Sequence, residues 1–97
     1  MQINKVREGS TLTVSVTGRL DTITAPELEA ALTDLSGVDL LVLNFAGLEY
    51  VSSAGLRVLL KTSKRMRMGG NMICRNVNDM IMEIFDITGF SEILTIE

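Results

Sequence analysis

The sequence contains no histidine, no tryptophan, a single cysteine and a single proline. Without histidine the chain cannot form a Ser-His-Asp or Cys-His catalytic centre, nor a zinc site of the usual Cys/His kind. With Cys74 alone it cannot close an internal disulfide, which fits a reducing compartment. These absences exclude the commonest nucleophilic and zinc-dependent chemistries before any motif is considered.

Length and composition predict one globular domain. The chain has 97 residues, of which 46% are hydrophobic and 22% charged, so residues 1–97 are expected to fold around one core. The formal net charge of −3 disfavours nucleic acid as a partner. No apolar run approaches the ~20 residues that cross a bilayer, and no signal peptide is visible. We therefore expect neither a nucleic-acid nor a membrane partner.

Hydrophobic periodicity predicts strands that alternate with helices. Residues 11–17 alternate with the period of two typical of a strand, and residues 39–45 are almost continuously apolar. The second pattern indicates a central strand buried on both faces, which implies helices on a parallel or mixed sheet. The predicted strands are 2–8, 11–17, 39–45, 71–75 and 92–96, and the predicted helices begin at Thr24, Ala54 and Val77. The order β-β-α-β-α-β-α-β is typical of a small α/β domain, with a small mixed β-sheet flanked by about three helices.

Local signals predict where several elements begin and end. Residues 18–21 are expected to leave the sheet after the second strand. The Thr24 hydroxyl is expected to cap the first helix, with Glu27 completing a capping box, and Gly37 is a natural stop. Gly89 is typical of a left-handed cap after the third helix.

Two adjacent serines, Ser52 and Ser53, precede the second helix and are followed by the small residues Ala54 and Gly55. Free amides and the positive end of the helix dipole stabilise an anion at a helix N-terminus, so a phosphoryl group is tolerated there. Ala54 and Gly55 leave the hydroxyls sterically open. Serine is also a preferred N-cap, and packing alone explains a glycine. The pattern by itself therefore leaves open whether either serine does more than cap the helix.

A basic stripe follows these serines. Five of the nine basic residues lie between 57 and 67, where there is no acid. Arg57, Lys61, Lys64 and Arg65 recur at i, i+4, i+7 and i+8 along the predicted helix. Such a stripe is ordinarily a solvated helix face, and it also complements an acidic partner.

The sulfur-containing residues gather in the second half of the chain, with five of six methionines between 66 and 82. Methionine fills cores and also lines adaptable binding surfaces. Met80 and Met82 lie off the apolar face of the third helix and are the candidates for a binding surface. Cys74, flanked by apolar residues on a predicted strand, is expected to be buried.

Three blocks of the sequence resemble the STAS domains of the bacterial anti-sigma factor antagonist family. Val51–Leu60 (VSSAGLRVLL) is similar to the family signature at the start of its second helix. Thr17–Thr22 (TGRLDT) is similar to the family's turn after the second strand, and the segment from Gly69 to Phe90 resembles its last helix and closing turn. The likeness covers essentially the whole chain in the family's order.

The resemblance implies a regulatory role. Members of this family are cytoplasmic bacterial proteins of partner-switching systems that control sigma-factor-dependent transcription. The unphosphorylated form binds an anti-sigma factor, usually also a serine kinase, and so releases the sigma factor. Phosphorylation of a serine abolishes this binding, and a serine phosphatase restores it. The implied protein acts as a monomer or weak homodimer and needs no cofactor or metal.

The resemblance also assigns roles to residues. Aligning the glycine of the family motif with Gly55 places the phosphorylated serine at Ser53. Ser52, Ala54 and Gly55 form the loop around it, with Ser52 where the family has aspartate and Ala54 where it has a second hydroxyl. Asp21 matches the family's aspartate beside the acceptor.

The partner surface is expected to include Asp21, Thr24, Arg57 and Lys61. Thr24 is first of all a cap, and Asp21 is also a plausible turn residue.

Two other functions stand beside this one. The two departures from the motif favour, as an alternative, a constitutive STAS scaffold or small-ligand sensor domain without a phosphorylation switch. An enzyme is not expected, because there is no P-loop and the carboxylates Asp21, Glu49 and Asp86 are too scattered for paired acid–base catalysis.

Overall fold

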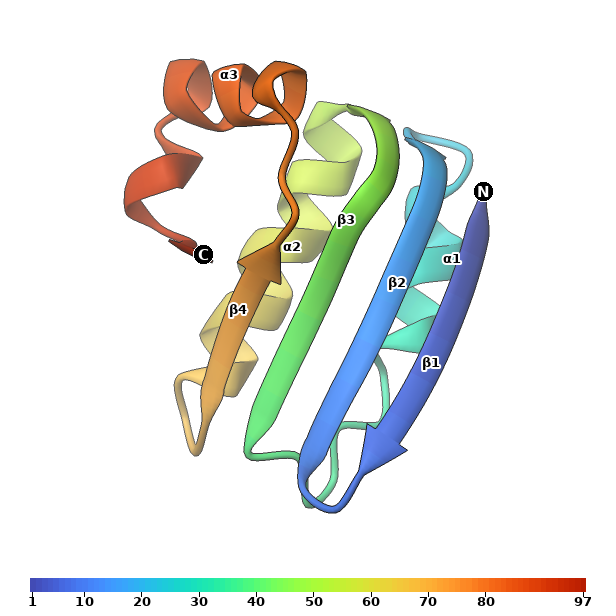
Figure 1. Cartoon of the computed structure of the whole chain (residues 1–97), viewed down its shortest axis with the longest axis vertical. Helices are drawn as coiled ribbons and strands as arrows, with labels where there is room; N and C mark the ends of the chain where they lie inside the picture. Colours follow the sequence, from blue (N-terminus) through green and yellow to red (C-terminus); the bar gives the residue numbers. More distant parts are fainter.

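A five-stranded mixed sheet organises the chain, and the computed structural model describes all 97 residues (Figure 1). The strands are β1 (Gln2–Glu8), β2 (Thr11–Leu20), β3 (Leu40–Val51), β4 (Asn71–Arg75) and β5 (Thr95–Ile96). The helices are α1 (Ala25–Ala31), α2 (Ser53–Met66), α3 (Asp79–Thr88) and the short 3₁₀ turn η1 (Phe90–Glu92). This arrangement confirms the fold class that the sequence predicts. No helix is both long and apolar enough to cross a membrane.

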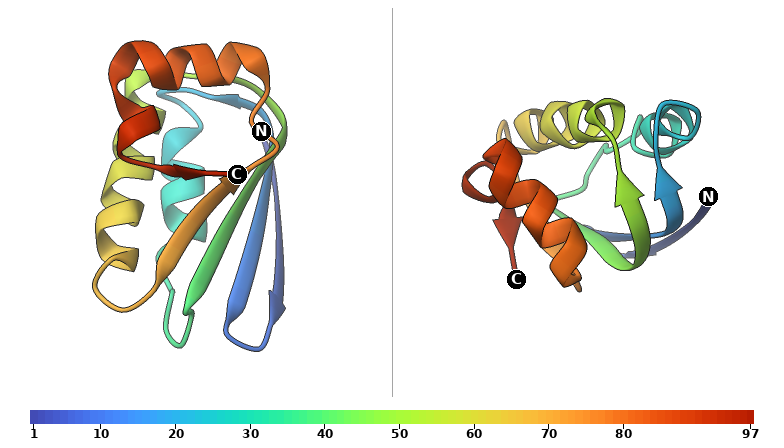
Figure 2. Two further views of the ribbon diagram at one scale, coloured as in Figure 1. Left: turned by 60° about the vertical axis from the view of Figure 1, so that its left-hand side comes forward. Right: turned by 90° about the horizontal axis from the view of Figure 1, so that it is seen from above.

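The strands lie in the sheet in chain order, β1-β2-β3-β4-β5. β1 and β2 form an antiparallel hairpin, whereas β2, β3, β4 and β5 run parallel. Parallel neighbours need a crossover, which helices supply, and crossovers of one hand carry successive helices to the same face. Figure 2 shows α1 and α2 side by side on one face, with α3 across the end of the sheet where β3 passes into α2.

The other face of the sheet carries no helix, although β3 was expected to be buried on both of its faces (Figure 2). Val42 lies on that face and is nevertheless only 5% exposed. It is shielded because β3 is a central strand, so Val42 pairs with Thr13 on β2 and with Ile73 on β4. The apolar run of β3 therefore reflects its central position in the sheet, between β2 and β4.

β2 and β3 are longer than the sequence predicts, and this extension builds the site described below. β2 continues to Leu20 rather than ending at residue 17, and β3 continues to Val51 rather than ending at residue 45. The added residues pair across two register shifts. At one of these shifts Gly18 adopts a φ of +104°, a conformation that other residues rarely take. Glycine here marks an irregularity inside the sheet, not an exit from it.

α1 is shorter than predicted, because it ends at Ala31, well before Gly37. Its end is capped from another element. The Arg65 guanidinium of α2 donates hydrogen bonds to the carbonyl oxygens of Leu32 and Thr33, at 2.8 and 2.7 Å. The last carbonyls of a helix lack intrahelical partners, so an arginine from the neighbouring helix satisfies them.

The C-terminal elements also differ from the prediction in their bounds. α3 begins at Asp79, two residues late, because the Asn78 side chain caps it by accepting from the N–H of Ile81 at 2.9 Å. β5 shrinks to two residues, since η1 occupies the start of the predicted strand. Gly89 ends α3 with a φ of +82°, which confirms the left-handed cap.

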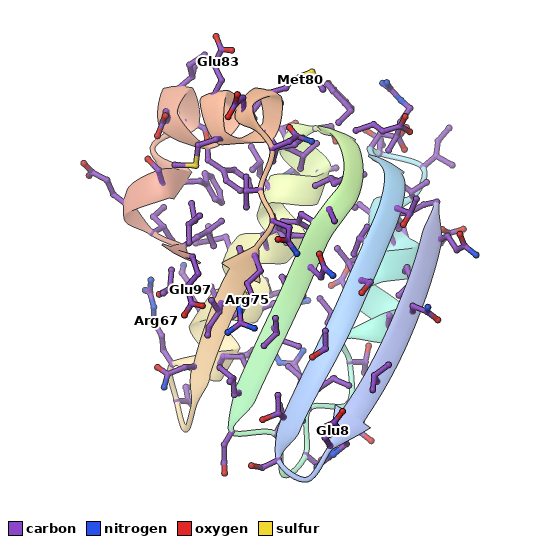
Figure 3. The ribbon with its side chains drawn as sticks, in the orientation of Figure 1. Glu8, Arg67, Arg75, Met80, Glu83 and Glu97 are labelled. Carbon is purple, nitrogen blue, oxygen red and sulfur yellow. The ribbon has the colours of Figure 1, made fainter.

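The core lies between the sheet and α1, α2 and α3. It includes the fully buried side chains of Leu28, Leu41, Phe45, Leu59, Ile81 and Phe85. Cys74 is buried in this core as predicted, and burial raises the pKa of its thiol to about 12. Met80 is 53% exposed at the outer surface of α3 (Figure 3), whereas Met82 is half-buried.

Gly55 is expected to tolerate no side chain unless the start of α2 moves. An added Cβ at Gly55 would lie 2.6 Å from Leu20 Cγ and 3.0 Å from Val51 Cγ2. We expect Gly55→Ala to lower the free energy of unfolding by about 1–3 kcal/mol, because α2 must move off the sheet. Gly69→Ala is the matched control, since nothing lies within 4 Å of its added Cβ. Urea unfolding measures both, and equal stability of the two variants contradicts the packing described.

The cap on α1 predicts a difference between two adjacent basic residues. Arg65→Ala removes two charge-assisted hydrogen bonds and is expected to cost about 1–2 kcal/mol of stability. Lys64→Ala removes an equal charge with no hydrogen-bond partner and is expected to change stability by less than about 0.5 kcal/mol. If urea midpoints show the same loss for both, Arg65 does not act as a cap.

Candidate functional site

The candidate site lies at the end of the sheet where β2 and β3 stop. Each of these parallel strands passes directly into a loop and then a helix, so both loops meet at the same edge (Figure 1). The N–H of Ser52 donates to the carbonyl oxygen of Leu20 at 2.8 Å, which joins the two loops. In α/β sheets this carboxyl edge is where functional groups ordinarily gather.

Ser52 is the N-cap of α2. Its backbone is extended, with φ −94° and ψ 175°, and its Oγ accepts from the N–H of Gly55 at 3.5 Å. The side chain is half-buried. The sequence pattern did not decide which of the two serines caps α2. The structure shows that Ser52 is the capping residue.

Ser53 is the first residue of α2 and is exposed. Its hydroxyl makes no hydrogen bond within the chain, whereas the neighbouring Ser52 is engaged. Gly55 is buried against β2 and β3, which holds the start of α2 close to the sheet and leaves Ser53 pointing outward. The arrangement presents one accessible hydroxyl, without a hydrogen bond, at the first residue of α2.

The opposite loop, Asp21 to Thr24, is a closed turn. Asp21 Oδ1 accepts from the N–H groups of Ile23 and Thr24, at 3.0 and 3.1 Å. The N–H of Thr24, together with the Thr24 hydroxyl and the N–H of Ile23, holds the pKa of the Asp21 carboxyl below its usual value. Asp21 is therefore an ionised turn residue beside the serines, and it belongs to the same edge as Ser53.

The capping box predicted for Thr24 and Glu27 is wrong. It occupies the N-cap position of α1, but its side chain makes no capping hydrogen bond. The hydroxyl instead donates to the carbonyl oxygen of Arg19 at 2.7 Å and accepts from the N–H of Asp21 at 2.8 Å. The threonine closes the turn that follows β2, because the longer strand places Arg19 within its reach.

A groove of about 300 Å³ runs between α1 and α2 beside these loops. Its lining comprises Thr22, Ala25, Pro26, Glu29, Ala54, Arg57, Val58 and Lys61. Two of the predicted partner-binding residues, Arg57 and Lys61, lie on this groove, and the other two, Asp21 and Thr24, lie in the adjacent turn. The structure thus brings the predicted site residues to one surface.

The basic stripe of α2 is a solvated helix face, as predicted, because Arg57, Lys61, Lys64 and Arg65 are all exposed. Lys61 Nζ lies 2.7 Å from Glu29 Oε1 on α1, and Arg65 caps α1 as described above. Arg57 and Lys64 are exposed and make no hydrogen bond or ion pair. These two are therefore the residues of the stripe whose charges have no partner within the chain.

The sequence pattern did not indicate three exposed or stacked residues of this edge, which are Ile23, Arg19 and Tyr50. Ile23 is 85% exposed in the turn beside the serines, an unusual position for a large apolar side chain. The Arg19 guanidinium stacks over the ring of Tyr50, 4.4 Å from its centroid. A lone isoleucine in a turn gives no periodic signal, and the Arg19–Tyr50 contact depends on the register shifts between β2 and β3.

Several exposed groups surround the Ser53 hydroxyl at this edge. No group of three or more His, Cys, Asp or Glu side chains is placed to hold a metal ion. No acidic or basic side chain forms a hydrogen bond with the Ser53 hydroxyl. What the edge offers is an open hydroxyl, a free guanidinium, an exposed isoleucine and a shallow groove.

Comparison with known proteins identifies the family. The profile of the STAS domain matches residues 2–97. The anti-sigma-B factor antagonist of Bacillus subtilis (strain 168) is 33% identical over 86 residues, which cover 86% of this chain and 78% of that protein. Among solved structures, an anti-sigma factor antagonist from Mycobacterium paratuberculosis superposes with a TM-score of 0.87 at 22% identity, covering 98% of this chain and 83% of that chain.

A second similar structure is that of the Bacillus cell fate determinant SpoIIAA in its phosphorylated form. It superposes with a TM-score of 0.76 at 17% identity and covers 99% of this chain and 91% of that chain. The family profile matches nearly every residue, and one relative is 33% identical. Together these two findings assign the chain to a family. The chain belongs to the STAS domain family.

Proposed function

We propose that this protein is an anti-sigma factor antagonist whose binding to an anti-sigma factor is switched off by phosphorylation of Ser53. The observation that carries the proposal is the contrast between the two serines. The hydroxyl of Ser52 caps the helix by accepting from the N–H of Gly55, whereas the hydroxyl of Ser53 is exposed and makes no hydrogen bond. The Bacillus subtilis relative, named an anti-sigma-B factor antagonist, supports the kind of partner.

The switch is electrostatic. A phosphoryl group adds a charge near −2 at neutral pH and strong hydrogen-bond acceptors to a surface that otherwise carries a neutral hydroxyl. A partner that packs against Ser53 would then have to desolvate this charge, which lowers its affinity. The phosphorylated form of SpoIIAA supports the idea that this fold accommodates such a group.

The surface that meets the anti-sigma factor surrounds Ser53. Ala54 and Arg57 lie on the adjoining groove, Asp21 lies in the neighbouring turn, and Ile23 provides an exposed apolar anchor. Arginine is among the residues that contribute most to binding when a partner buries them, and burial of an exposed isoleucine removes apolar surface from water. The protein acts by binding and not as an enzyme.

The partner-switching cycle completes the proposal. The anti-sigma factor doubles as the serine kinase, a serine phosphatase restores the free form, and the protein works in the cytoplasm as a monomer or weak homodimer. The alternative is a constitutive scaffold or small-ligand sensor, for which the groove between α1 and α2 offers a place. It is favoured by Ser52 and Ala54, where the family motif has an aspartate and a second hydroxyl.

The phosphorylation site is tested by incubating the protein with ATP and the anti-sigma factor kinase of its own organism, followed by mass spectrometry of the peptides. We expect the wild type to gain one phosphoryl group at position 53 and Ser53→Ala to gain none. Ser52→Ala is the matched control, expected to accept phosphate at position 53 while losing about 1 kcal/mol of stability with its cap. Equal phosphorylation of Ser53→Ala and wild type contradicts the assignment, and an unmodified wild type favours the constitutive scaffold.

A further inference from the structure

Arg57 is the basic residue of α2 that lies nearest to Ser53 in the sequence, and its guanidinium has no partner within the chain. It lies four residues after Ser53, so the two side chains project from the same side of the helix with Cβ atoms about 5–6 Å apart. Arg57 is exposed and makes no hydrogen bond or ion pair, although Lys61 and Arg65 on the same helix and Arg67 at its C-cap all have partners. A free guanidinium therefore lies within reach of any group attached to Ser53.

From these observations we propose that Arg57 is the internal counter-ion of phosphoserine at position 53. The inference rests on the proposed function, since it concerns the phosphorylated form of the same site. Guanidinium and phosphate form charge-assisted, often bidentate hydrogen bonds. The groove beside Ala54 and Arg57 leaves space for the arginine to turn toward the phosphoryl group.

The other charges around Ser53 do not replace Arg57. Asp21, in the loop joined to Ser52, is ionised and repels a phosphate. Arg19 is stacked on Tyr50 and lies 3.9 Å from the Asp21 carboxylate, which takes up part of its charge. Lys61 lies one turn beyond Arg57 and is paired with Glu29. Arg57 is therefore the cation that decides how the charge of the phosphate is balanced.

This pairing gives the switch a second component. In the unphosphorylated protein Arg57 is free to meet an acidic group of the partner. In the phosphorylated protein the same guanidinium is held by the phosphate, and the local charge changes from +1 to about −1. Phosphorylation thus removes an attractive contact as well as adding a repulsive one.

The experiment places phosphoserine at position 53 during translation, so it needs no kinase. The second pKa of the phosphate, about 6 for free phosphoserine, is then measured by phosphorus NMR as a function of pH. A nearby cation favours the dianion, so we expect this pKa to be lower in the wild type than in Arg57→Met by about half a unit. Arg57→Lys, which keeps the charge, is expected to restore part of the difference.

Lys64→Met is the matched control. Lys64 is also an exposed basic residue of α2 without a partner, but it lies eleven residues from Ser53, about 16 Å along the helix. That distance exceeds the Debye length at physiological salt, about 8 Å, so its removal is expected to leave the phosphate pKa unchanged. Equal pKa values in wild type and Arg57→Met overturn the inference, as does an equal rise in Lys64→Met. Because no kinase is used, a shifted pKa stands even if no kinase modifies Ser53, so the two proposals fail separately.

Discussion

The contact between the start of α2 and the ends of β2 and β3 is the constraint on which the site depends. Gly55 lies so close to Leu20 and Val51 that a single added carbon would overlap them. The N–H of Ser52 reaches the Leu20 carbonyl at 2.8 Å because the helix sits directly on the strand ends. This packing fixes the first turn of α2 at the edge of the sheet, so the position of Ser53 does not depend on a flexible loop.

Two adjacent serines have different roles because the helix geometry separates them. The N-cap residue turns its hydroxyl back onto a backbone N–H, and Ser52 does so toward Gly55. The next residue already belongs to the helix and points outward, so Ser53 stays free for a covalent change. The phosphoryl group that we propose on Ser53 would therefore leave the Ser52 cap in place, and the switch would act on the surface without unfolding α2.

Much of the fold was predictable because it follows from local patterns. The order of elements, the bounds of β4 and the left-handed Gly89 all come from periodicity and backbone preference within a few residues. The extension of β2 and β3 was not predictable, because glycines and register shifts interrupt the alternation where the strands still pair. The pattern of a strand is lost there while its hydrogen bonds persist.

The site residues stay predictions, and the structure shows where they lie and which groups they contact. The resemblance to the family indicated Ser53 and Asp21, the basic stripe indicated Arg57, and the three residues lie near the same end of the sheet. The use of the Thr24 hydroxyl and the capping role of Arg65 depend on groups from other elements, respectively the Arg19 carbonyl and the end of α1. No local pattern encodes such tertiary partners.

The central claim is that phosphate on Ser53 controls binding to an anti-sigma factor. Isothermal titration calorimetry of the cognate anti-sigma factor against the unmodified protein and against the protein carrying phosphoserine at position 53 tests it most directly. The account predicts that the phosphorylated form binds at least about tenfold more weakly, a difference of about 1.4 kcal/mol. Equal affinity of the two forms would contradict it.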